Sequence, residues 1–238
     1  MRVFKAILTV LSVAIIVALL RFDNRLSLSV MGIALLFYLL SSAIHLLAHE
    51  CGHFIGGAIS GYKLLCLQLG PLKVVIKNDK PILVWRGSLS GQCVMIPKQV
   101  NSVCFKAYNL GGILANTLIV VLGFVLLLFD SFWMALLFVE LMCVGIQKIL
   151  VNAIPHKTNS VPNDGYIVKI LKKDKAIQKD YAIYLMLYGK LFLDEDISPQ
   201  DFTYEREVSE DEDEMLYYNE IQDILKSSNR QITKEGLS

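Results

Sequence analysis

Residues 45–54 read His-Leu-Leu-Ala-His-Glu-Cys-Gly-His-Phe, which contains the pattern His-Glu-x-x-His at His49, Glu50 and His53. On a helix, side chains four residues apart lie one above the other on the same face. Two imidazoles in that arrangement can bind one zinc ion, and the glutamate beside the first histidine can act as general base on a zinc-bound water molecule. The pattern predicts a catalytic metal site with His49 and His53 as ligands and Glu50 as the base.

The residues before this pattern are mostly apolar, and positions 26–44 read Leu-Ser-Leu-Ser-Val-Met-Gly-Ile-Ala-Leu-Leu-Phe-Tyr-Leu-Leu-Ser-Ser-Ala-Ile. We therefore expect the metal motif to lie on a membrane-spanning helix from about Leu28 to Ile59. The glycines expected to end this helix are Gly56, Gly57 and Gly61. A chance match to a five-residue pattern is the competing interpretation. Ionisable side chains cost about 2.5–3.5 kcal/mol each at the centre of a spanning helix, however, so they are rare there and usually functional.

The composition narrows the class of protein. Hydrophobic residues make up 54% of the 238-residue chain, which exceeds the usual share in a soluble domain. With a formal net charge of +1, the composition shows no excess of basic residues of the kind typical of nucleic-acid-binding proteins. Five cysteines without paired Cys-x-x-Cys spacing argue against a disulfide framework. Cys51 lies inside the metal motif, but its side chain is turned roughly 160° from that of His49 on a helix, so we expect it to pack against a neighbouring helix.

Four apolar segments predict four transmembrane helices, at about residues 3–20, 28–59, 108–129 and 132–154. The first segment follows a basic start, so a signal peptide is the competing interpretation for it. No small-x-small cleavage site follows, because residues 21–25 read Arg-Phe-Asp-Asn-Arg, and this favours an uncleaved span.

Lysine and arginine residues are concentrated before the first apolar segment, between the second and third, and after the fourth. By the positive-inside rule these regions lie in the cytoplasm, so we predict a multi-pass protein of the cell membrane with both termini cytoplasmic. Arg21 and Arg25, in the predicted outer loop, count slightly against this topology. The metal motif is then at the cytoplasmic end of the second span.

The rest of the chain predicts a sheet and a helical tail. Residues 62–106 contain short β-prone runs and a turn at Asn78-Asp79-Lys80-Pro81, which predict a small hairpin or three-stranded sheet. From Gly165 onward the chain is polar with helical periodicity, at about residues 166–175, 181–193 and 215–227. The acidic run at residues 207–214 is typical of a solvated helix start.

The predicted fold class is an all-α polytopic membrane protein, with about four transmembrane helices, a small membrane-associated β-hairpin and a helical cytoplasmic tail. We expect three parts in the chain. Residues 1–27 form an N-terminal transmembrane segment and a short outer loop, and residues 28–165 form a core of three spans plus the hairpin at 62–106. Residues 166–238 form the helical cytoplasmic C-terminal region.

A catalytic zinc ion usually has three protein ligands and one open position, so a third ligand must come from elsewhere. His45 is eight residues from His53, or about 12 Å along a helix, and both could not readily bind one ion. Pro155 is expected to end the fourth span, and Asp164-Gly165 follows at the membrane depth predicted for the histidines. Asp164 is therefore the better candidate, with a simple Asp-Gly turn as the competing interpretation.

Three motifs together resemble the site-2 protease family of intramembrane zinc metalloproteases. They are His-Glu-Cys-Gly-His at 49–53, Gly-Gly-Ile-Leu-Ala-Asn at 111–116, and Asn-Ala-Ile-Pro at 152–155 followed by Asp-Gly at 164–165. The resemblance covers about residues 28–166. It implies that zinc is held by His49, His53 and Asp164, and that Glu50 activates water.

The resemblance also assigns roles to polar residues near the spans. It implies that Asn116 and Asn152 lie near the substrate and the metal, for substrate binding or transition-state support. Asp164 is preferred to His156 as third ligand, because Asp-Gly matches the family and because His156 directly follows a proline. Two features depart from the family: the gap between Asn152 and Asp164 is longer, and Ile113 stands where the family usually has proline.

Glu140, in the fourth span, is not assigned by the resemblance. An ionisable residue inside a span is often functional, so Glu140 is either a functional intramembrane acid or a protonated or paired group near the outer end of the helix. Both interpretations stay open on the sequence.

We therefore predict an intramembrane zinc metalloendopeptidase that cleaves a membrane-embedded or membrane-associated substrate, either a membrane protein or a peptide precursor. Glu50 would take a proton from the zinc-bound water, which acts as nucleophile, and pass it to the leaving amine. The alternative is a non-catalytic membrane protein of the same fold that binds a peptide or partner, and the intact Glu50 argues against it. A metal-binding transporter or sensor is a further alternative, against which the small number of spans argues.

Overall fold

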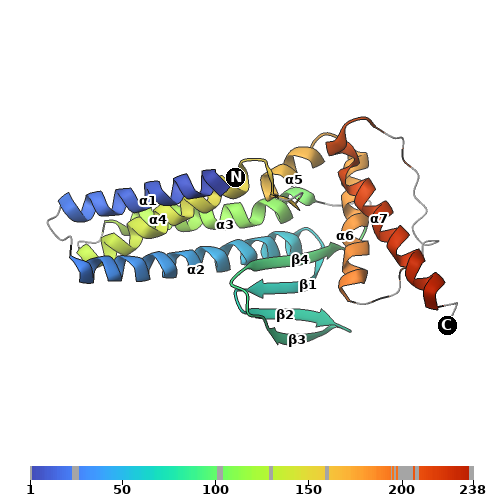
Figure 1. The fold of residues 1–238 in the computed structure, drawn as a ribbon, viewed down its shortest axis with the longest axis horizontal. Helices are drawn as coiled ribbons and strands as arrows, with labels where there is room; N and C mark the ends of the chain where they lie inside the picture. Colours follow the sequence, from blue (N-terminus) through green and yellow to red (C-terminus); the bar gives the residue numbers. More distant parts are fainter. Residues whose placement is uncertain are drawn as a thin grey trace.

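A computed structural model describes residues 2–22, 27–100, 104–128, 131–158, 161–193, 195, 197, 206 and 209–235. The helices are α1 (Arg2–Phe22), α2 (Leu28–Ile59), α3 (Phe105–Leu126), α4 (Phe132–Ala153), α5 (Asp164–Leu171), α6 (Lys175–Phe192) and α7 (Glu212–Glu235). The strands are β1 (Tyr62–Leu69), β2 (Leu72–Lys77), β3 (Lys80–Trp85), β4 (Gly91–Pro97), β5 (Lys157–Thr158) and β6 (Val161–Pro162). Figure 1 shows α1–α4 as an elongated bundle, with the larger sheet and α5–α7 gathered at one end, near the start of α1.

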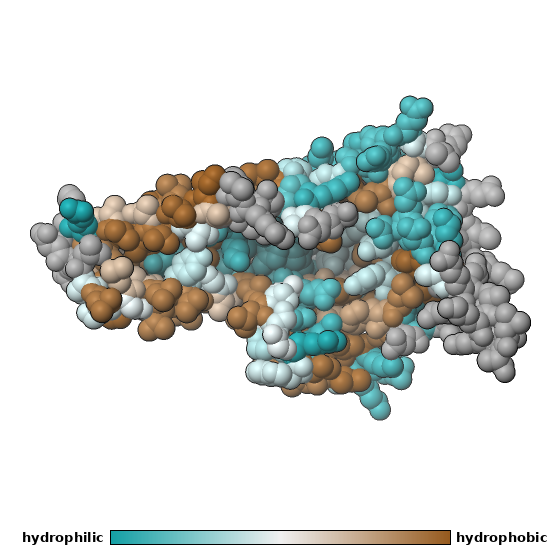
Figure 2. All heavy atoms as spheres, in the orientation of Figure 1, coloured by the Kyte–Doolittle hydropathy of each residue, from teal (hydrophilic) through white to brown (hydrophobic). Residues whose placement is uncertain are grey.

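Three of the described helices, α2, α3 and α4, are long and apolar enough to cross a membrane. Their large apolar side chains face outward: Leu36 is 65% exposed, Leu118 70% and Phe124 67%. Figure 2 shows this apolar surface over the bundle and hydrophilic side chains around α5–α7. An exposed apolar surface of this extent favours contact with lipid. In α1 the residues whose side chains the structure describes include the apolar stretch Ala6–Ala18, which is by itself too short to cross a membrane, so the fourth span stays a prediction.

Helix α2 has the predicted bounds. The side chain of Ser27 caps its start by accepting a hydrogen bond from the Val30 N–H. The helix is followed by Gly61, whose φ of +81° is one that residues with a Cβ rarely adopt. The other two glycines expected to end the helix, Gly56 and Gly57, lie inside it instead.

Two glycines within α2 let it pack closely on α3. A Cβ at Gly52 would collide with the backbone carbonyl of Gly111, and a Cβ at Gly56 would collide with that of Ala107. Small residues four apart on facing helices allow two membrane helices to approach until their backbones touch. The helix that carries the histidines is therefore fixed directly against α3.

The larger sheet is antiparallel, with the strand order β3-β2-β1-β4. It has four strands where a hairpin or three-stranded sheet was predicted, because a turn at Gly70, with φ of +63°, divides one predicted run into β1 and β2, and because β4 was not named from the sequence. The turn at Asn78 and Asp79 is confirmed, and φ values of +51° and +57° are typical of a two-residue hairpin loop. Lys80 and Pro81, which were expected in this turn, belong to β3.

The two edges of this sheet face different surroundings. Edge strand β3 exposes apolar side chains, with Leu83 67% and Trp85 72% exposed. Edge strand β4 lies against the C-terminal half of α2. The Met95 side chain packs so closely beside Gly57 that a Cβ on this glycine would collide with the Met95 sulfur. This position brings the start of β4 next to the metal motif.

The polar end of the molecule is built by α5, α6 and α7, which correspond to the three predicted tail helices. Its core contains Tyr181 of α6 and Tyr217 of α7, packed with Tyr108 of α3 and Met95 of β4. This shared core joins the tail to the sheet and to the bundle.

The acidic run before α7 has more than the predicted role. Glu212, Asp213 and Glu214 do occupy the first turn of the helix. Two acids of the run also form ion pairs, Asp211 with Lys173 at 2.6 Å and Asp213 with Lys157 at 3.2 Å. The run therefore also connects α7 to the segments that follow α4 and α5.

Cysteine labelling would test which side of the membrane the polar end faces. By the positive-inside rule we expect the sheet and both termini to be cytoplasmic. In a background without native cysteines, Asn24→Cys, which lies outside the described residues, should react with an impermeant maleimide in intact cells. Asp79→Cys, at a sheet turn where the native side chain is 82% exposed, should react only after lysis. Labelling of Asp79→Cys in intact cells would contradict the topology.

Candidate metal centre

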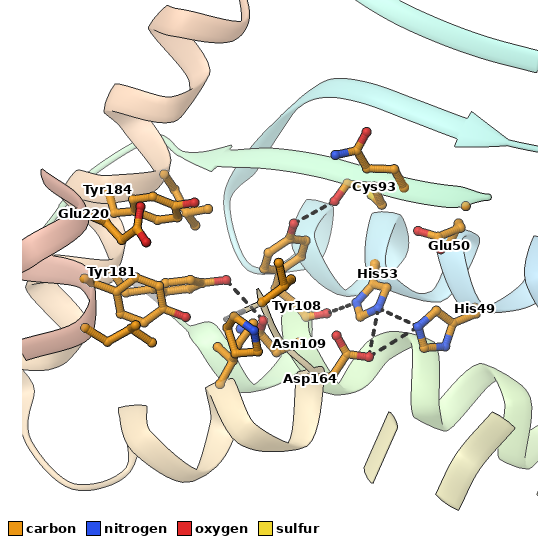
Figure 3. Close-up of a pocket in the computed structure, with 18 residues that line it drawn as sticks. His49, Glu50, His53, Cys93, Tyr108, Asn109, Asp164, Tyr181, Tyr184 and Glu220 are labelled. Atoms are coloured by element: carbon orange, nitrogen blue, oxygen red, sulfur yellow. Dashed lines mark hydrogen bonds and ion pairs between the residues drawn. The ribbon is translucent and has the colours of Figure 1, made fainter. Parts of the chain in front are cut away.

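Three ligand atoms converge at the polar end of the bundle: Nε2 of His49, Nε2 of His53 and Oδ2 of Asp164. The two nitrogens are 3.1 Å apart, and the carboxylate oxygen is 3.3 Å from each. Within the described part of the chain, this is the one group of at least three His, Cys, Asp or Glu residues whose ligand atoms all lie within 4.8 Å of one another. The structure thus brings the three predicted ligands together, from α2 and from the first residue of α5 (Figure 3).

The imidazole of His53 has its proton on Nδ1. That nitrogen lies 2.7 Å from the backbone carbonyl oxygen of Tyr108, which can only accept a hydrogen bond. In a neutral imidazole the other nitrogen, Nε2, then carries a lone pair. Since Nε2 is the atom that faces Asp164, the contact with Tyr108 orients the ring for metal binding.

His49 is oriented by a chain of polar contacts across α2, α3 and α4. The amide of Asn116 lies between two imidazoles, 3.0 Å from Nδ1 of His45 and 3.3 Å from Nδ1 of His49. His45 is fully buried, and its Nε2 lies 2.9 Å from the carbonyl oxygen of Leu141. His45 is therefore not a metal ligand, in agreement with its distance along the helix, and it supports Asn116 instead.

Hydrogen-bond chemistry decides which way the Asn116 amide faces. A neutral His45 must donate to the Leu141 carbonyl, so its Nδ1 can only accept. As placed, the amide oxygen faces His45, where both groups would be acceptors. Exchanging the oxygen and the NH2 group, which are nearly equal in size, lets Asn116 donate to His45 and accept from Nδ1 of His49. The lone pair of His49 is then on Nε2, facing Asp164.

The centre of the site therefore contains three electron-pair donors that point at one another. Two lone pairs and a carboxylate oxygen at 3.1–3.3 Å are stable together only with a proton or a cation between them. Asp164 Oδ2 is buried and has no hydrogen-bond partner among the described residues. Burial raises the pKa of Asp164, but hydrogen bonds from Nε2 of protonated His49 and His53 outweigh burial and lower it to about 2. A cation in place of those protons would keep the carboxylate ionised in the same way. These residues fit a bound metal ion.

The residues on either side of Asp164 hold it at the site. Asn163 Nδ2 lies 2.8–3.0 Å from three carbonyl oxygens at the end of α4, which belong to Val151, Asn152 and Ile154. The Oδ1 atom of Asn163 accepts from the Tyr166 N–H and caps the start of α5. A Cβ at Gly165 would collide with the carbonyl of Ala153, so glycine allows α5 to approach α4 this closely. Asn163 and Gly165 thus join two helix ends and place the carboxylate.

Glu50 lies beside the three ligands without joining them (Figure 3). Its side chain is 7% exposed and lines the same cavity. Strand β4 approaches so closely that a Cβ at Gly91 would collide with the Glu50 carboxylate. On the other side, Gly112 of α3 leaves room for the imidazoles, because a Cβ there would collide with both His49 and His53. The packing therefore holds Glu50 close to the ligands.

The site opens into a cavity of about 420 Å³. Its wall is formed by α2, β4, α3, β6 and α5, and it extends to Tyr184 on α6 and Glu220 on α7. Cys93 also lines it, and burial, followed by the charge of Glu50, raises the pKa of this thiol to about 12. Cys93 is therefore a neutral thiol at physiological pH. None of the five cysteines forms a disulfide bond.

The remaining predicted residues lie outside the ligand group. His156 Nδ1 contacts the carbonyl oxygen of Ile154 at 2.9 Å, within its own turn. Asn152 donates to the Lys148 carbonyl at 3.0 Å, and neither Asn152 nor Asn116 is among the residues that line the cavity. Asn116 thus positions His49, while a direct role toward substrate stays a prediction for both asparagines.

Glu140 lies away from the metal centre. It is 3% exposed, and its Oε2 has no hydrogen-bond partner among the described residues. It lines a separate, mainly apolar cavity of about 480 Å³ between α1, α2 and α4. The described residues therefore give no partner for Oε2, while a functional acid and a protonated group both stay open as interpretations.

Three residues that shape the site were not predicted, namely Gly91, Tyr108 and Asn163, and Gly112 entered the predictions only as a member of the motif at 111–116. Asn163 carries a local signal, because asparagine directly before a helix is a common N-cap. The carbonyl of Tyr108 and the close contacts at the two glycines depend on tertiary packing, so the sequence has no local signal for them.

Comparisons with protein-family models, curated proteins and solved structures find no match for this chain. The resemblance to site-2 proteases therefore stays a prediction from three short motifs. What the protein does has to be inferred from the geometry of the site.

Replacement of Asn116 would test the chain of contacts that orients His49. Asn116→Leu removes both polar contacts at similar volume, so we expect metal affinity to fall about 10- to 100-fold, as on loss of an outer partner of a metal-bound histidine. Asn116→Asp keeps an acceptor for Nδ1 of His49 and should bind metal more tightly than Asn116→Leu. Competition with a chromogenic zinc chelator measures both affinities, and equal affinity of Asn116→Leu and wild type would contradict the assignment.

Proposed function

We propose that this protein is a membrane-embedded zinc endopeptidase that hydrolyses peptide bonds in membrane-embedded or membrane-associated substrates. The observation that supports this most is the convergence of His49, His53 and Asp164 beside Glu50 in one cavity. Two imidazoles and one carboxylate form a donor set that catalytic zinc uses in peptidases, with one position left open. The site lies where three candidate membrane spans meet the polar end of the molecule.

Zinc on these ligands would lower the pKa of a bound water molecule to about 7 and polarise the carbonyl of the scissile bond. Glu50 is outside the ligand group, so its carboxylate is free to take a proton from the attacking water. The same carboxyl group would then donate that proton to the leaving nitrogen, which departs as an amine. A transporter, a sensor or a non-catalytic binding protein needs no such base, and so the position of Glu50 favours an enzyme.

Edge strand β4 supports binding of an extended peptide. Gly91, Gln92 and Cys93, at the start of this strand, line the cavity beside Glu50. An edge strand offers backbone N–H and C=O groups outside the sheet, to which an extended peptide can add as a further strand. Of these groups, the Cys93 carbonyl already accepts a hydrogen bond from the Tyr108 hydroxyl at 2.9 Å. A substrate bound in this way would pass close to the metal ligands.

A helical substrate must unwind before it is cut, because its carbonyl groups are hydrogen-bonded within the helix. Unwinding in lipid exposes backbone polar groups at a cost of several kcal/mol each unless they find partners. Good substrates should therefore carry Gly, Pro or Asn near the cut. By the loop charges, the cut should lie in the cytoplasmic half of the apolar segment.

Membrane peptidomics would test this function. Products that appear with wild type and not with Glu50→Gln identify substrates, and we expect their cut sites in the cytoplasmic half of the span. Replacing a glycine near the cut by leucine should slow cleavage about fivefold, since the helix propensities differ by about 1 kcal/mol. Association of that substrate with Glu50→Gln protein should persist. Cut sites in the outer half would rule out the proposed geometry.

A further inference from the structure

The cavity that holds the metal ligands has a second polar region, where α6 and α7 form its wall. Three tyrosine rings cluster there, with centroids 4.8 Å apart for Tyr181 and Tyr217 and 5.3 Å apart for Tyr184 and Tyr217. All three tyrosines are among the residues that line the cavity, as is Glu220. Figure 3 shows Tyr181, Tyr184 and Glu220 across the cavity from His49 and Glu50. These four residues, Tyr181, Tyr184, Tyr217 and Glu220, form what we call the tyrosine subsite.

Glu220 is an exposed carboxylate that forms no ion pair within the described ranges of the chain. Other acids of the tail are paired: Asp180 with Arg206, Asp211 with Lys173, and Asp213 with Lys157. The charge of Glu220 acts on the rings, since burial raises the pKa of Tyr184 to about 12 and Glu220 is the next cause of the rise. The tyrosine subsite therefore combines aromatic faces with an uncompensated negative charge.

Tyr217 adds an unused hydrogen-bond donor to the tyrosine subsite. The side chain is 4% exposed, and its hydroxyl group has no hydrogen-bond partner among the residues that the structure describes. The hydroxyl of Tyr181, in contrast, donates to Oδ1 of Asn109 at 3.1 Å. A buried hydroxyl without a partner is unfavourable, so at a residue that lines a cavity it points to a ligand with an acceptor group.

We propose that the tyrosine subsite binds a lysine or arginine side chain of the substrate and so determines which peptides are cut, an inference that rests on the proposed peptidase function. A cation near the faces of aromatic rings and beside a carboxylate is attracted by both. The aliphatic part of the side chain would pack along Leu216 and the rings, with the charged group at the exposed Glu220. The Tyr217 hydroxyl would donate to a backbone carbonyl of the same peptide.

The charge of the tyrosine subsite agrees with the predicted topology. If the polar end of the molecule is cytoplasmic, the substrate segments that reach α6 and α7 are those that flank a membrane span on its cytoplasmic side. Such segments are rich in lysine and arginine. Glu220 would therefore select the basic flank of the substrate while Glu50 acts on the scissile bond.

Peptide selection by the full-length, zinc-loaded protein in lipid nanodiscs would test this inference. Glu50→Gln protein is incubated with a random decapeptide library, and bound peptides are identified by mass spectrometry. We expect lysine- or arginine-containing peptides to be enriched about five- to tenfold over their glutamine counterparts. Adding Glu220→Gln should remove this enrichment. Adding Asp223→Asn should leave it unchanged, because this 79% exposed acid on the same helix does not line the cavity.

Equal recovery of basic and glutamine-containing peptides would overturn the proposal that the tyrosine subsite binds basic side chains. Enrichment of basic peptides that persists with Glu220→Gln would overturn it as well. The selected peptides are then incubated with protein that retains Glu50. Enrichment without cleavage would keep the tyrosine subsite and overturn the peptidase, whereas cleavage without enrichment would keep the peptidase and overturn the subsite.

Discussion

Glu50→Gln is expected to abolish peptide hydrolysis while the protein keeps its metal. Glutamine has nearly the same shape as glutamate, so the packing against Gly91 is preserved, but an amide cannot take a proton from water at neutral pH. General-base catalysis contributes about 10²- to 10⁴-fold to rates, so we expect a loss of about 10³-fold or more. Metal content should stay near one ion per chain, because Glu50 is not among the three ligands.

The measurement pairs metal content with product formation on the same preparation. Glu212→Gln, which removes an exposed acid in the first turn of α7, is the matched control and should behave as wild type. Loss of metal from a folded Glu50→Gln protein would show that Glu50 is a ligand. Undiminished hydrolysis would show that another group acts as base.

Asp164→Ala is expected to lose the metal, while His156→Ala retains it. Asp164 supplies one of the three converging atoms, whereas His156 contacts the carbonyl of Ile154. Loss of a direct ligand should weaken binding by more than the 10- to 100-fold that loss of an outer partner costs. Two imidazoles alone should not retain the ion through dialysis.

Metal analysis of purified, dialysed protein would decide between the two candidates. Circular dichroism and gel filtration confirm that each variant is folded and dispersed. Metal retained by Asp164→Ala and lost from His156→Ala would refute the assignment of the third ligand. Loss from both variants would indicate that the segment between α4 and α5 must be intact, and Asp164→Asn, which keeps an oxygen at the same place, would then be expected to restore part of the binding.

The helical core could be predicted from the sequence because its signals are local. The start and end of α2 and the start of α4 follow from long apolar runs that are bounded by polar residues or glycine. Pro155 correctly predicts the end of α4, whose last residue is Ala153. The sheet was predicted less well, since residues 64–77 read as one apolar run. The Gly70-Pro71 pair inside that run is itself a turn signal, and it marks the boundary between β1 and β2.

The three residues of the candidate metal site were also predictable, His49 and His53 from the spacing of His-Glu-x-x-His and Asp164 from the Asp-Gly pair, although Asp164 lies farther from Asn152 than in the family. The groups that orient them were not. The carbonyl of Tyr108 fixes His53, but every residue has a carbonyl, and only packing decides which one is used. His45 was excluded as a ligand from its distance along the helix, yet its role in supporting Asn116 depends on Leu141 of another helix.

An ion bound between α2 and the first residue of α5 would be a cross-link between the bundle and the tail. A ligand that binds only the assembled form stabilises that form, by about 4 kcal/mol when its free concentration is 1,000 times its Kd. Chelation should therefore loosen α5–α7 before the bundle itself melts, and limited proteolysis would detect this order of events. The coupling is reciprocal, so a partner that draws α5 away from α4 would weaken metal binding by the same factor. The available zinc would then govern how firmly the tail holds its place over the site.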